Sequence, residues 1–132
     1  MLPYMHLYRL AQVAQLLSVS DDTVRRWVDA GKLTTTVDHD GKRAVDGAVL
    51  AGFAVSLAGD PAGPAATSAR NAFPGIITRV LRGDVVSQVE VQSGPHRLVS
   101  LMTTESVDEL GLVPGAPARA SVKSTHVVVE LP

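Results

Sequence analysis

The segment GDPAGPAAT at residues 59–67 most constrains the fold, because its prolines, glycines and small residues neither pack a core nor continue a helix. Before this segment the apolar residues recur at helical spacing, whereas after it they alternate as in strands. A chain of 132 residues holds one ordinary domain or two very small ones. We therefore predict an α+β protein with two small domains, residues 1–58 and 68–132, joined by a linker.

The first domain begins with a pattern of two short helices and a tight turn. Apolar residues recur at helical spacing in the first helix, namely at Leu10, Val13, Ala14 and Leu17. Ser20 is a suitable N-cap for the second helix, and Gly31 suits the left-handed position that ends it. The second helix is expected to bury Val24, Trp27 and Val28, which leaves its polar residues facing solvent.

A β-hairpin and a third helix follow. Asp40-Gly41 lies between β-branched residues and is a strong hairpin signal, while Asp46 is suited to cap the next helix. Four apolar residues of that helix are expected to close the core of the domain: Val49, Leu50, Phe53 and Leu57.

This order of elements resembles the winged helix-turn-helix of the MerR and excisionase type, especially in LAQVAQLLSVSDDTVRRWVDAGKL. The resemblance implies that the second helix enters the DNA major groove and that the basic hairpin, the wing, contacts the flanking backbone. The residues expected to contact DNA are Thr23, Arg25, Arg26, Lys32, Lys42 and Arg43. Residues 1–60 carry six Lys or Arg against seven Asp or Glu, so attraction to phosphate must be local.

The second domain is predicted to be mostly strands. One face of DVVSQVEVQS carries Val85, Ser87, Val89 and Val91, as a half-buried strand requires. A turn leads to a partner strand at residues 96–102, and residues 103–112 interrupt the pattern with a short helix. Ser106 and Glu109 form a plausible capping box for that helix, and Gly111 ends it. An OB-like barrel of about five strands would remove the exposed strand edges.

This half resembles the molybdate-binding Mop domain, of the molbindin or TOBE type, over residues 68–131. The segments SARN, FPGIITRV, TTESVDELGL and VKSTHVVV carry the resemblance. It implies a barrel that associates by exchanging strands and binds molybdate or tungstate between subunits. The family's donor positions match six residues of this chain: Ser68, Arg70, Thr103, Ser106, Lys123 and Ser124.

These residue types also suit a tetrahedral oxyanion on chemical grounds. A dianion offers only acceptors, so its site needs donors and positive charge on several sides. Arg70 supplies a forked donor and Lys123 a mobile charge, while the other four supply hydroxyls. The start of the short helix adds a positive dipole end. Phosphate carries a proton near neutral pH and would need an acceptor, so we expect molybdate or tungstate to be preferred.

Several classes of function are excluded or disfavoured. The chain has no cysteine, which excludes disulfides and thiolate chemistry and favours a reducing cytoplasm. The four histidines are scattered without ligand spacing, so we predict no metal-cation site. No phosphate loop, nucleophile elbow or acid-base constellation is present, so we predict no enzyme. The amino-terminal segment lacks a signal-peptide pattern, and no apolar stretch suits a membrane, so we expect a soluble, unexported chain.

We predict a transcriptional regulator that binds DNA through its first domain and molybdate or tungstate through its second. Because each domain is small and the family's sites lie between subunits, we expect a homo-oligomer of at least two chains, with a hexamer also allowed. Two alternatives stay open: a molybdate storage or buffering protein whose first domain serves assembly, and an adaptor that binds a protein partner. Neither the operator nor the sign of regulation follows from the sequence.

Overall fold

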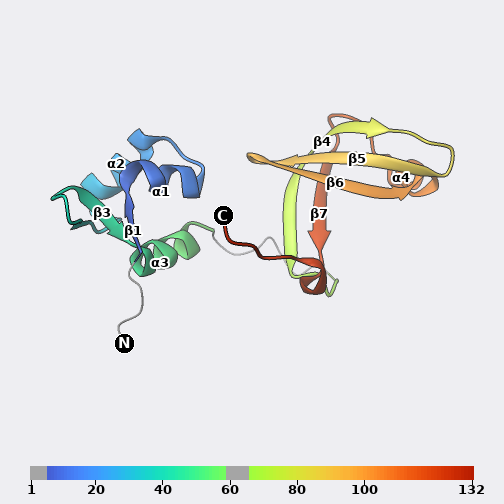
Figure 1. Cartoon of the computed structure of the whole chain (residues 1–132). Helices are drawn as coiled ribbons and strands as arrows, with labels where there is room; N and C mark the ends of the chain where they lie inside the picture. Colours follow the sequence, from blue (N-terminus) through green and yellow to red (C-terminus); the bar gives the residue numbers. More distant parts are fainter. Residues whose placement is uncertain (1–5, 59–65) are drawn as a thin grey trace. The chain divides into compact units, whose positions relative to one another are not determined.

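The structure, a computed structural model, describes residues 6–58 and 66–132 (Figure 1). The chain divides into two compact units, Met1–Gly63 and Pro64–Pro132, which we call the N unit and the C unit. Most of the predicted linker lies outside the described residues. Within the described ranges, no helix combines the length and the apolar character that crossing a membrane requires.

The N unit packs three helices on a small antiparallel sheet of strand order β1-β3-β2. Its elements are β1 (Leu7–Arg9), α1 (Leu10–Leu17), α2 (Asp21–Asp29), β2 (Thr36–Val37), β3 (Arg43–Asp46) and α3 (Gly47–Ala58). The core buries Val13, Ala14, Val24, Leu33, Val45 and Leu50. The helix pair therefore forms where the sequence predicts it. Strand β1 was not predicted, because three residues are too few to establish a period.

The turn between α1 and α2 depends on local capping. Ser20 caps α2 as predicted, its hydroxyl oxygen accepting the Thr23 amide at 3.1 Å. At the other end, the Gly31 amide donates to the carbonyl of Val28 at 3.0 Å, which satisfies one of the last free carbonyls of the helix. Both ends of α2 are therefore specified by the residues beside them.

Helix α3 meets the core through fewer residues than expected. Leu50 is buried, and Phe53 packs edge-on against Trp27 with ring centroids 5.0 Å apart. Val49 and Leu57, which were predicted to lie in the core, are exposed. Val49 points about a quarter turn away from Leu50, and Leu57 lies in the last turn, beyond the small core.

Five residues join β2 to β3, and a hydrogen bond between Asp38 and Lys42 encloses the middle three. The amide of Asp38 donates to the carbonyl of Lys42 at 2.9 Å, and Gly41 has a φ of +75°. A two-residue turn of the Asp-Gly type would need positive φ at Asp40 as well, and Gly41 is the only loop residue of this hairpin that has it. The hairpin thus forms around Asp40-Gly41 as predicted, with Gly41 at its left-handed position.

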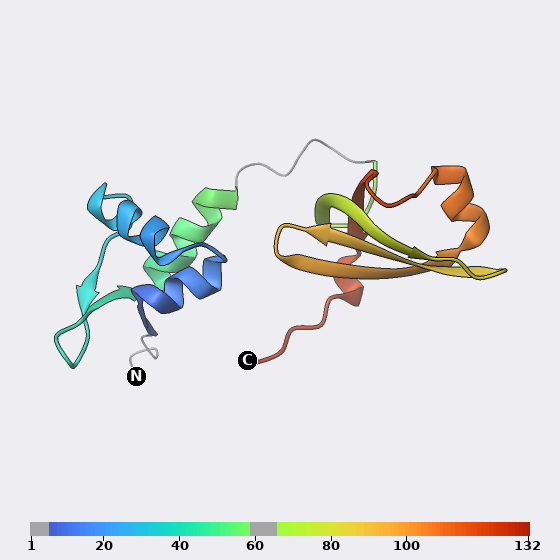
Figure 2. The same ribbon diagram turned by 90° about the horizontal axis from the view of Figure 1, so that it is seen from above.

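The C unit is a curled antiparallel sheet with a short helix at one end (Figures 1 and 2). Its strand order is β6-β5-β4-β7. Its elements are β4 (Asn71–Leu81), β5 (Val86–Ser93), β6 (His96–Thr103), α4 (Thr104–Leu110), β7 (Pro117–Val122) and the 3-10 turn η1 (Ser124–His126). A barrel of about five strands was expected, but the described part of the C unit holds four, with β6 and β7 as its edges. One chain thus forms a half-barrel.

Strand β4 gives the C unit its shape, because its two halves pair with different strands. Residues 71–76 pair with β7, whereas residues 76–81 pair with β5 across a bulge. At Gly75, a Cβ atom would come within 2.1 Å of the Gln92 carbonyl oxygen, so only glycine permits this approach. The first half of β4 and β7 form a two-stranded arm that leads away from the other strands (Figure 1).

The core of the C unit lies between the sheet and α4, and its buried apolar residues are Ile77, Val89, Val91 and Val107. Ser87 shares the buried face of β5 as predicted, but Val85 is exposed because it precedes the strand. Helix α4 ends at a left-handed Gly111 as predicted. Its cap is Thr103, not Ser106, because Ser106 is the third helical residue and its amide donates to the Thr103 hydroxyl at 3.1 Å.

Candidate functional sites

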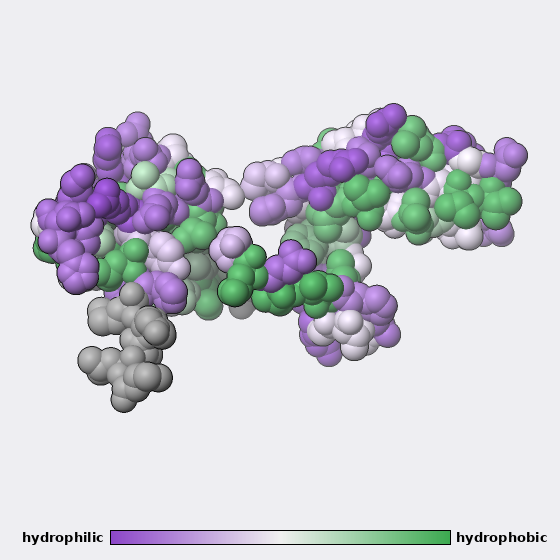
Figure 3. Space-filling model, viewed as in Figure 1, coloured by the Kyte–Doolittle hydropathy of each residue, from purple (hydrophilic) through white to green (hydrophobic). Residues whose placement is uncertain are grey.

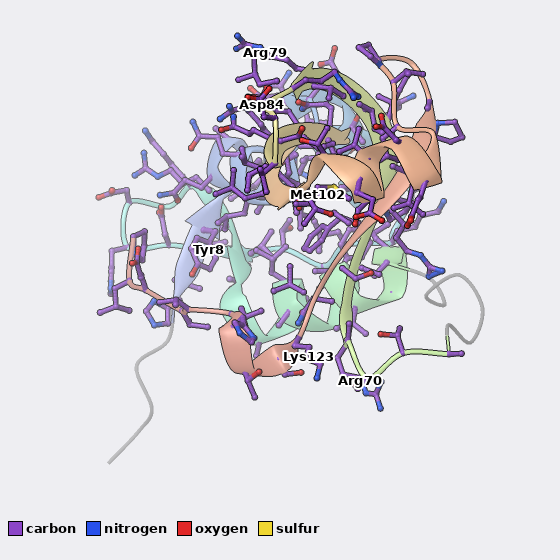
Figure 4. All side chains as sticks on the ribbon, turned by 90° about the vertical axis from the view of Figure 1, so that its right-hand side faces the viewer. Tyr8, Arg70, Arg79, Asp84, Met102 and Lys123 are labelled. Atoms are coloured by element: carbon purple, nitrogen blue, oxygen red, sulfur yellow. The ribbon has the colours of Figure 1, made fainter. Side chains whose placement is uncertain are left out.

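Arg70 and Lys123 lie opposite each other at the end of the two-stranded arm. Asn71, the first residue of β4, pairs with Val122, the last of β7, so the residues that flank this pair are neighbours. The Asn71 side chain reinforces the junction by donating to the Val122 carbonyl at 3.0 Å. Figure 4 shows the two cations together at this end of the C unit. Two residues more than fifty positions apart in sequence are therefore adjacent.

The neighbours of these cations are exposed polar groups. Ser68 precedes Arg70 by two residues, and Ser124 follows Lys123 at the start of η1; all four side chains are exposed. One Arg70 nitrogen donates to the Thr67 carbonyl at 3.2 Å. No salt bridge within residues 6–58 and 66–132 involves either cation. We call Ser68, Arg70, Lys123 and Ser124 the arm cluster. Its hydroxyl donors and two positive charges are therefore accessible to an anion.

Thr103 and Ser106 lie at the start of α4, and their hydroxyls bond to each other at 2.7 Å. Thr103 also accepts the Ser106 amide, so in one chain this pair serves to cap the helix. Glu105 adds a carboxylate in the same turn. We call Thr103 and Ser106 the helix pair.

One chain does not bring the arm cluster and the helix pair together. The arm cluster lies where β4 begins, whereas Thr103 pairs with Val86 beyond the strand's other end. At a rise of about 3.3 Å per residue, the eleven residues of β4 extend over roughly 33 Å along the strand. Met102, next to Thr103, lies far from Arg70 in Figure 4. A site that uses both sets therefore requires more than one chain.

A buried polar network beneath α4 was not found from the sequence. The hydroxyls of Ser87 and Thr104 lie 2.6 Å apart, and the Thr104 hydroxyl also donates to the Gly83 carbonyl at 2.8 Å. The Thr104 amide donates to the Val85 carbonyl at 2.8 Å. Together these bonds hold the start of α4 against the β4–β5 turn. A serine on the otherwise apolar face of β5 was the only sequence signal for this network.

Two ion pairs stabilise the C unit away from the arm cluster. Arg82 binds Asp108 of α4 through two contacts of 2.8 and 3.2 Å, and this hydrogen bonding lowers the pKa of Asp108. Glu90 of β5 is buried and accepts a hydrogen bond from Arg97, which lowers the pKa of Glu90. Both pairs hold neighbouring elements together.

The residues predicted to contact DNA lie on α2 and around the hairpin. Arg25 and Arg26 are exposed on α2, and Thr23 is half-buried beside them. Both arginines also contact their own helix: Arg25 lies 3.8 Å from Asp22, and Arg26 donates to the Thr23 hydroxyl at 3.2 Å. Exposed long side chains exchange such contacts at little cost.

The basic residues outside α2 are Lys32, just after the helix, and Lys42 and Arg43 at the start of β3. All three are exposed. The sequence prediction missed a contact beside them, because Arg9 lies within ion-pair distance of two carboxylates of the hairpin loop. No group of three or more histidine, aspartate or glutamate side chains in the described ranges could hold a metal ion.

Comparison with known proteins assigns both units to families. A family model described as the TOBE domain matches residues 67–129, and one described as a helix-turn-helix domain matches residues 7–50. The order of the two families along the chain is the order expected from the sequence.

These curated relatives each match about half of the chain. A molybdenum-pterin-binding protein 2 from Clostridium pasteurianum is 36% identical over 63 residues, covering 47% of this chain and 93% of the relative. The molybdenum transport protein ModE from Herbaspirillum seropedicae is 42% identical over 64 residues, covering 48% of this chain. The chain spans only 24% of the length of ModE. None of these names is that of an enzyme.

Among solved structures, a molybdate-binding protein from Sporomusa ovata is 30% identical to this chain. The match covers 51% of this chain and all of the other, with a TM-score of 0.49.

Proposed function

The chain belongs to the TOBE-domain family, and from this premise we propose that it is a molybdate- or tungstate-responsive, DNA-binding regulator of transcription that acts in the cytoplasm. The observation that carries the proposal is the joining, in one chain, of a domain shared with molybdenum-binding proteins and a helix-turn-helix unit. The TOBE domain would sense the oxyanion, and the N unit would bind DNA. We propose no catalytic step.

The arm cluster supplies the chemistry for the oxyanion. Arg70 and Lys123 face each other across the end of the arm, so their two positive charges match the charge of a tetrahedral dianion. Ser68 and Ser124 add hydroxyl donors beside them. Charge-assisted donors contribute about 1.5 to 3 kcal/mol each, roughly twice as much as neutral ones. The two cations are therefore the main determinants of affinity in this proposal.

The helix pair joins the site only if a second copy of the chain brings it to the arm cluster. Thr103 and Ser106 would then exchange their mutual hydrogen bond for bonds to the anion. A site made in this way would couple ligand binding to subunit association, since neither chain holds all the donors. We propose a homo-oligomer of at least two chains for this reason.

The open edges of the half-barrel support association. Strands β6 and β7 have free edges within the described C unit, and the sheet lines a groove of about 620 Å³ whose lining residues are mostly apolar. After η1, residues 127–132 form neither helix nor strand, and Val128, Val129 and Leu131 are 80%, 89% and 95% exposed. Figure 3 shows this segment as a hydrophobic surface. We propose that it pairs with the half-barrel of a second chain.

In the N unit, we propose that α2 enters the major groove and that the β2–β3 hairpin contacts the flanking phosphates as a wing. Arg25 and Arg26 would leave their partners on α2 for bases or phosphates. A storage protein is the second candidate, favoured by one observation: residues 1–60 carry seven Asp or Glu against six Lys or Arg, so the N unit is not basic overall.

A calorimetric titration of the full chain with molybdate, tungstate, sulfate and phosphate tests the proposed ligand. Molybdate and tungstate should bind well above sulfate, with almost no binding of phosphate; equal affinity for sulfate and molybdate would refute the assignment. Retention of genomic DNA fragments, with and without molybdate, then separates regulation from storage. A chain that binds molybdate and retains no fragment would be a storage protein.

Light scattering at micromolar concentration tests the association. The parent should be at least a dimer, and Val129→Asp, which adds a charge to the exposed apolar segment, should shift it toward monomer. Glu130→Gln, one residue away, is the matched control and should leave the assembly unchanged. A parent that stays monomeric with molybdate present would remove the shared-site model.

A further inference from the structure

The hairpin tip of the N unit, residues 38–43, carries as many acids as bases. Asp38 and Asp40 oppose Lys42 and Arg43, so the loop and the start of β3 have no net charge by themselves. Two carboxylates beside two cations would repel the phosphate that the cations attract. A wing that contacts DNA therefore needs these carboxylates to be neutralised.

Arg9 supplies that charge from another element. It is the last residue of β1, which pairs with β3 at Arg9 and Ala44. Its guanidinium lies 3.4 Å from the Asp38 carboxylate through Nε and 3.2 Å from the Asp40 carboxylate through Nη2. One planar group with several donors can bridge two acids in this way, which a lysine ammonium does less well. With Arg9 included, the hairpin tip has a net charge of +1.

The carboxylates of Asp38 and Asp40 differ in their contacts with the loop backbone. Asp38 accepts the amides of Asp40 and Lys42, both at 2.9 Å, and so shapes the loop. Its side chain is 14% exposed, whereas that of Asp40 is 70% exposed. Asp40 binds Arg9 but closes no turn of the loop, so its charge can be removed without removing a backbone contact. Asp40 is two residues from Lys42 in sequence, so its exposed charge would oppose a phosphate bound by Lys42.

We infer that Arg9 is a positioning residue for DNA binding: it neutralises the two acids of the hairpin loop so that Lys42 and Arg43 can bind the phosphate backbone. This inference rests on the proposed DNA-binding function. It adds a residue outside the recognition helix and the wing, on a strand that the sequence did not predict.

The test measures binding of the full-length variants to the genomic fragment that the parent retains most tightly, across a series of salt concentrations. Arg9→Ala should weaken binding about fivefold or more at low salt and lower the salt slope by about one unit, because the wing loses its phosphate contact. Arg9→Lys should fall between parent and Arg9→Ala. Molybdate affinity without DNA should not change.

Adding Asp40→Asn to Arg9→Ala separates neutralisation from simple bracing. If Arg9 acts through charge, the double variant should recover most of the parent's affinity, because the unmatched carboxylate is gone. If Arg9 only held the loop in its conformation, Asp40→Asn would not restore DNA binding. Thermal unfolding of each variant accompanies the measurement. Should Arg9→Ala fail to fold, Asp40→Asn alone decides the matter: it should keep or raise the parent's affinity, and weaker binding would overturn the inference.

Lys42→Ala distinguishes failure of the inference from failure of the proposed function. If Lys42→Ala weakens DNA binding while Arg9→Ala does not, the wing binds DNA without help from Arg9 and the inference is wrong. If Arg9→Ala weakens binding but Asp40→Asn restores none of it, Arg9 is only a brace and the inference is wrong as well. A parent that retains no fragment would overturn the regulator proposal and this inference together.

Discussion

The N unit and the C unit differ in whether one chain completes them. The N unit encloses its core between three helices and a sheet. The C unit leaves two strand edges and an apolar terminal segment open, and it separates its candidate donors into two groups. On our proposal, the N unit can act alone, whereas the C unit acquires its site by association. The predictions below test this difference.

The largest effect is expected from Gly75→Val, which should destabilise the C unit by about 3 kcal/mol or more, because the new side chain would collide with backbone. The N unit should unfold as before, since its core contains nothing from this region. Thermal unfolding followed by circular dichroism and by Trp27 fluorescence, which reports on the N unit, checks this. Gly52→Ala on α3, where a Cβ meets nothing within 4 Å, is the control and should be neutral or stabilising. Loss of both units at once would show that they fold together.

Removing either cation of the arm cluster should have the next largest effect. Arg70→Ala or Lys123→Ala should each weaken molybdate binding by more than tenfold, since each charge-assisted donor contributes about 1.5 to 3 kcal/mol. Ser68→Ala, Thr103→Ala and Ser106→Ala should each cost on the order of 1 kcal/mol. Calorimetry of folded variants gives these values.

In the double variant of Arg70 and Lys123, the loss of molybdate-binding free energy should differ from the sum of the two single losses, because both cations would contact one ligand. A single cation variant that binds molybdate as the parent does would remove that position from the site. If Thr103→Ala and Ser106→Ala have no effect while the arm variants do, the oxyanion is held by the arm cluster alone, and the helix pair only caps α4.

In the N unit, Arg25→Ala or Arg26→Ala should weaken DNA binding by about 1 to 3 kcal/mol if the side chain contacts a base. Molybdate affinity without DNA should be unaffected. DNA retention and calorimetry on the same preparations measure both. Parental DNA binding by both arginine variants, on every fragment tested, would favour the storage function.

The smallest effect concerns pH and the Glu90–Arg97 pair of the C unit. Hydrogen bonding from Arg97 lowers the pKa of Glu90 below its ordinary 4.5 in the folded state, so the pair's stabilisation is present above that pH and is lost as pH falls through the lowered pKa. Unfolding of the C unit should become easier below pH 4.5. Arg97→Gln should reduce this pH dependence; an unchanged profile in that variant would show that other groups cause it.

The caps illustrate what local sequence predicts well and where it fails. Ser20 and Gly31 were identified because a cap contacts residues only a few positions away. The cap of α4 was placed three residues late, since Thr103 and Ser106 are equally plausible by type and only the end of β6 selects Thr103. Helix α3 was identified, but two of its four expected core residues are exposed. The helix is apolar on nearly all sides, so its sequence does not indicate which face is buried.

The sequence by itself determined that this chain has two units of different class, where most of their helices and strands lie, and which families they belong to, since these features follow from short-range periodicity, capping and motif residues. Only the tertiary structure decided which distant residues meet. Strand pairing puts Arg70 beside Lys123 and carries Thr103 to the far end of the sheet, and it brings Arg9 to the acids of the hairpin. The physical reason is that strands pair through backbone hydrogen bonds, and the backbone is chemically alike along the whole chain. Which strand pairs with which, and in what register, therefore depends on the packing of the whole unit.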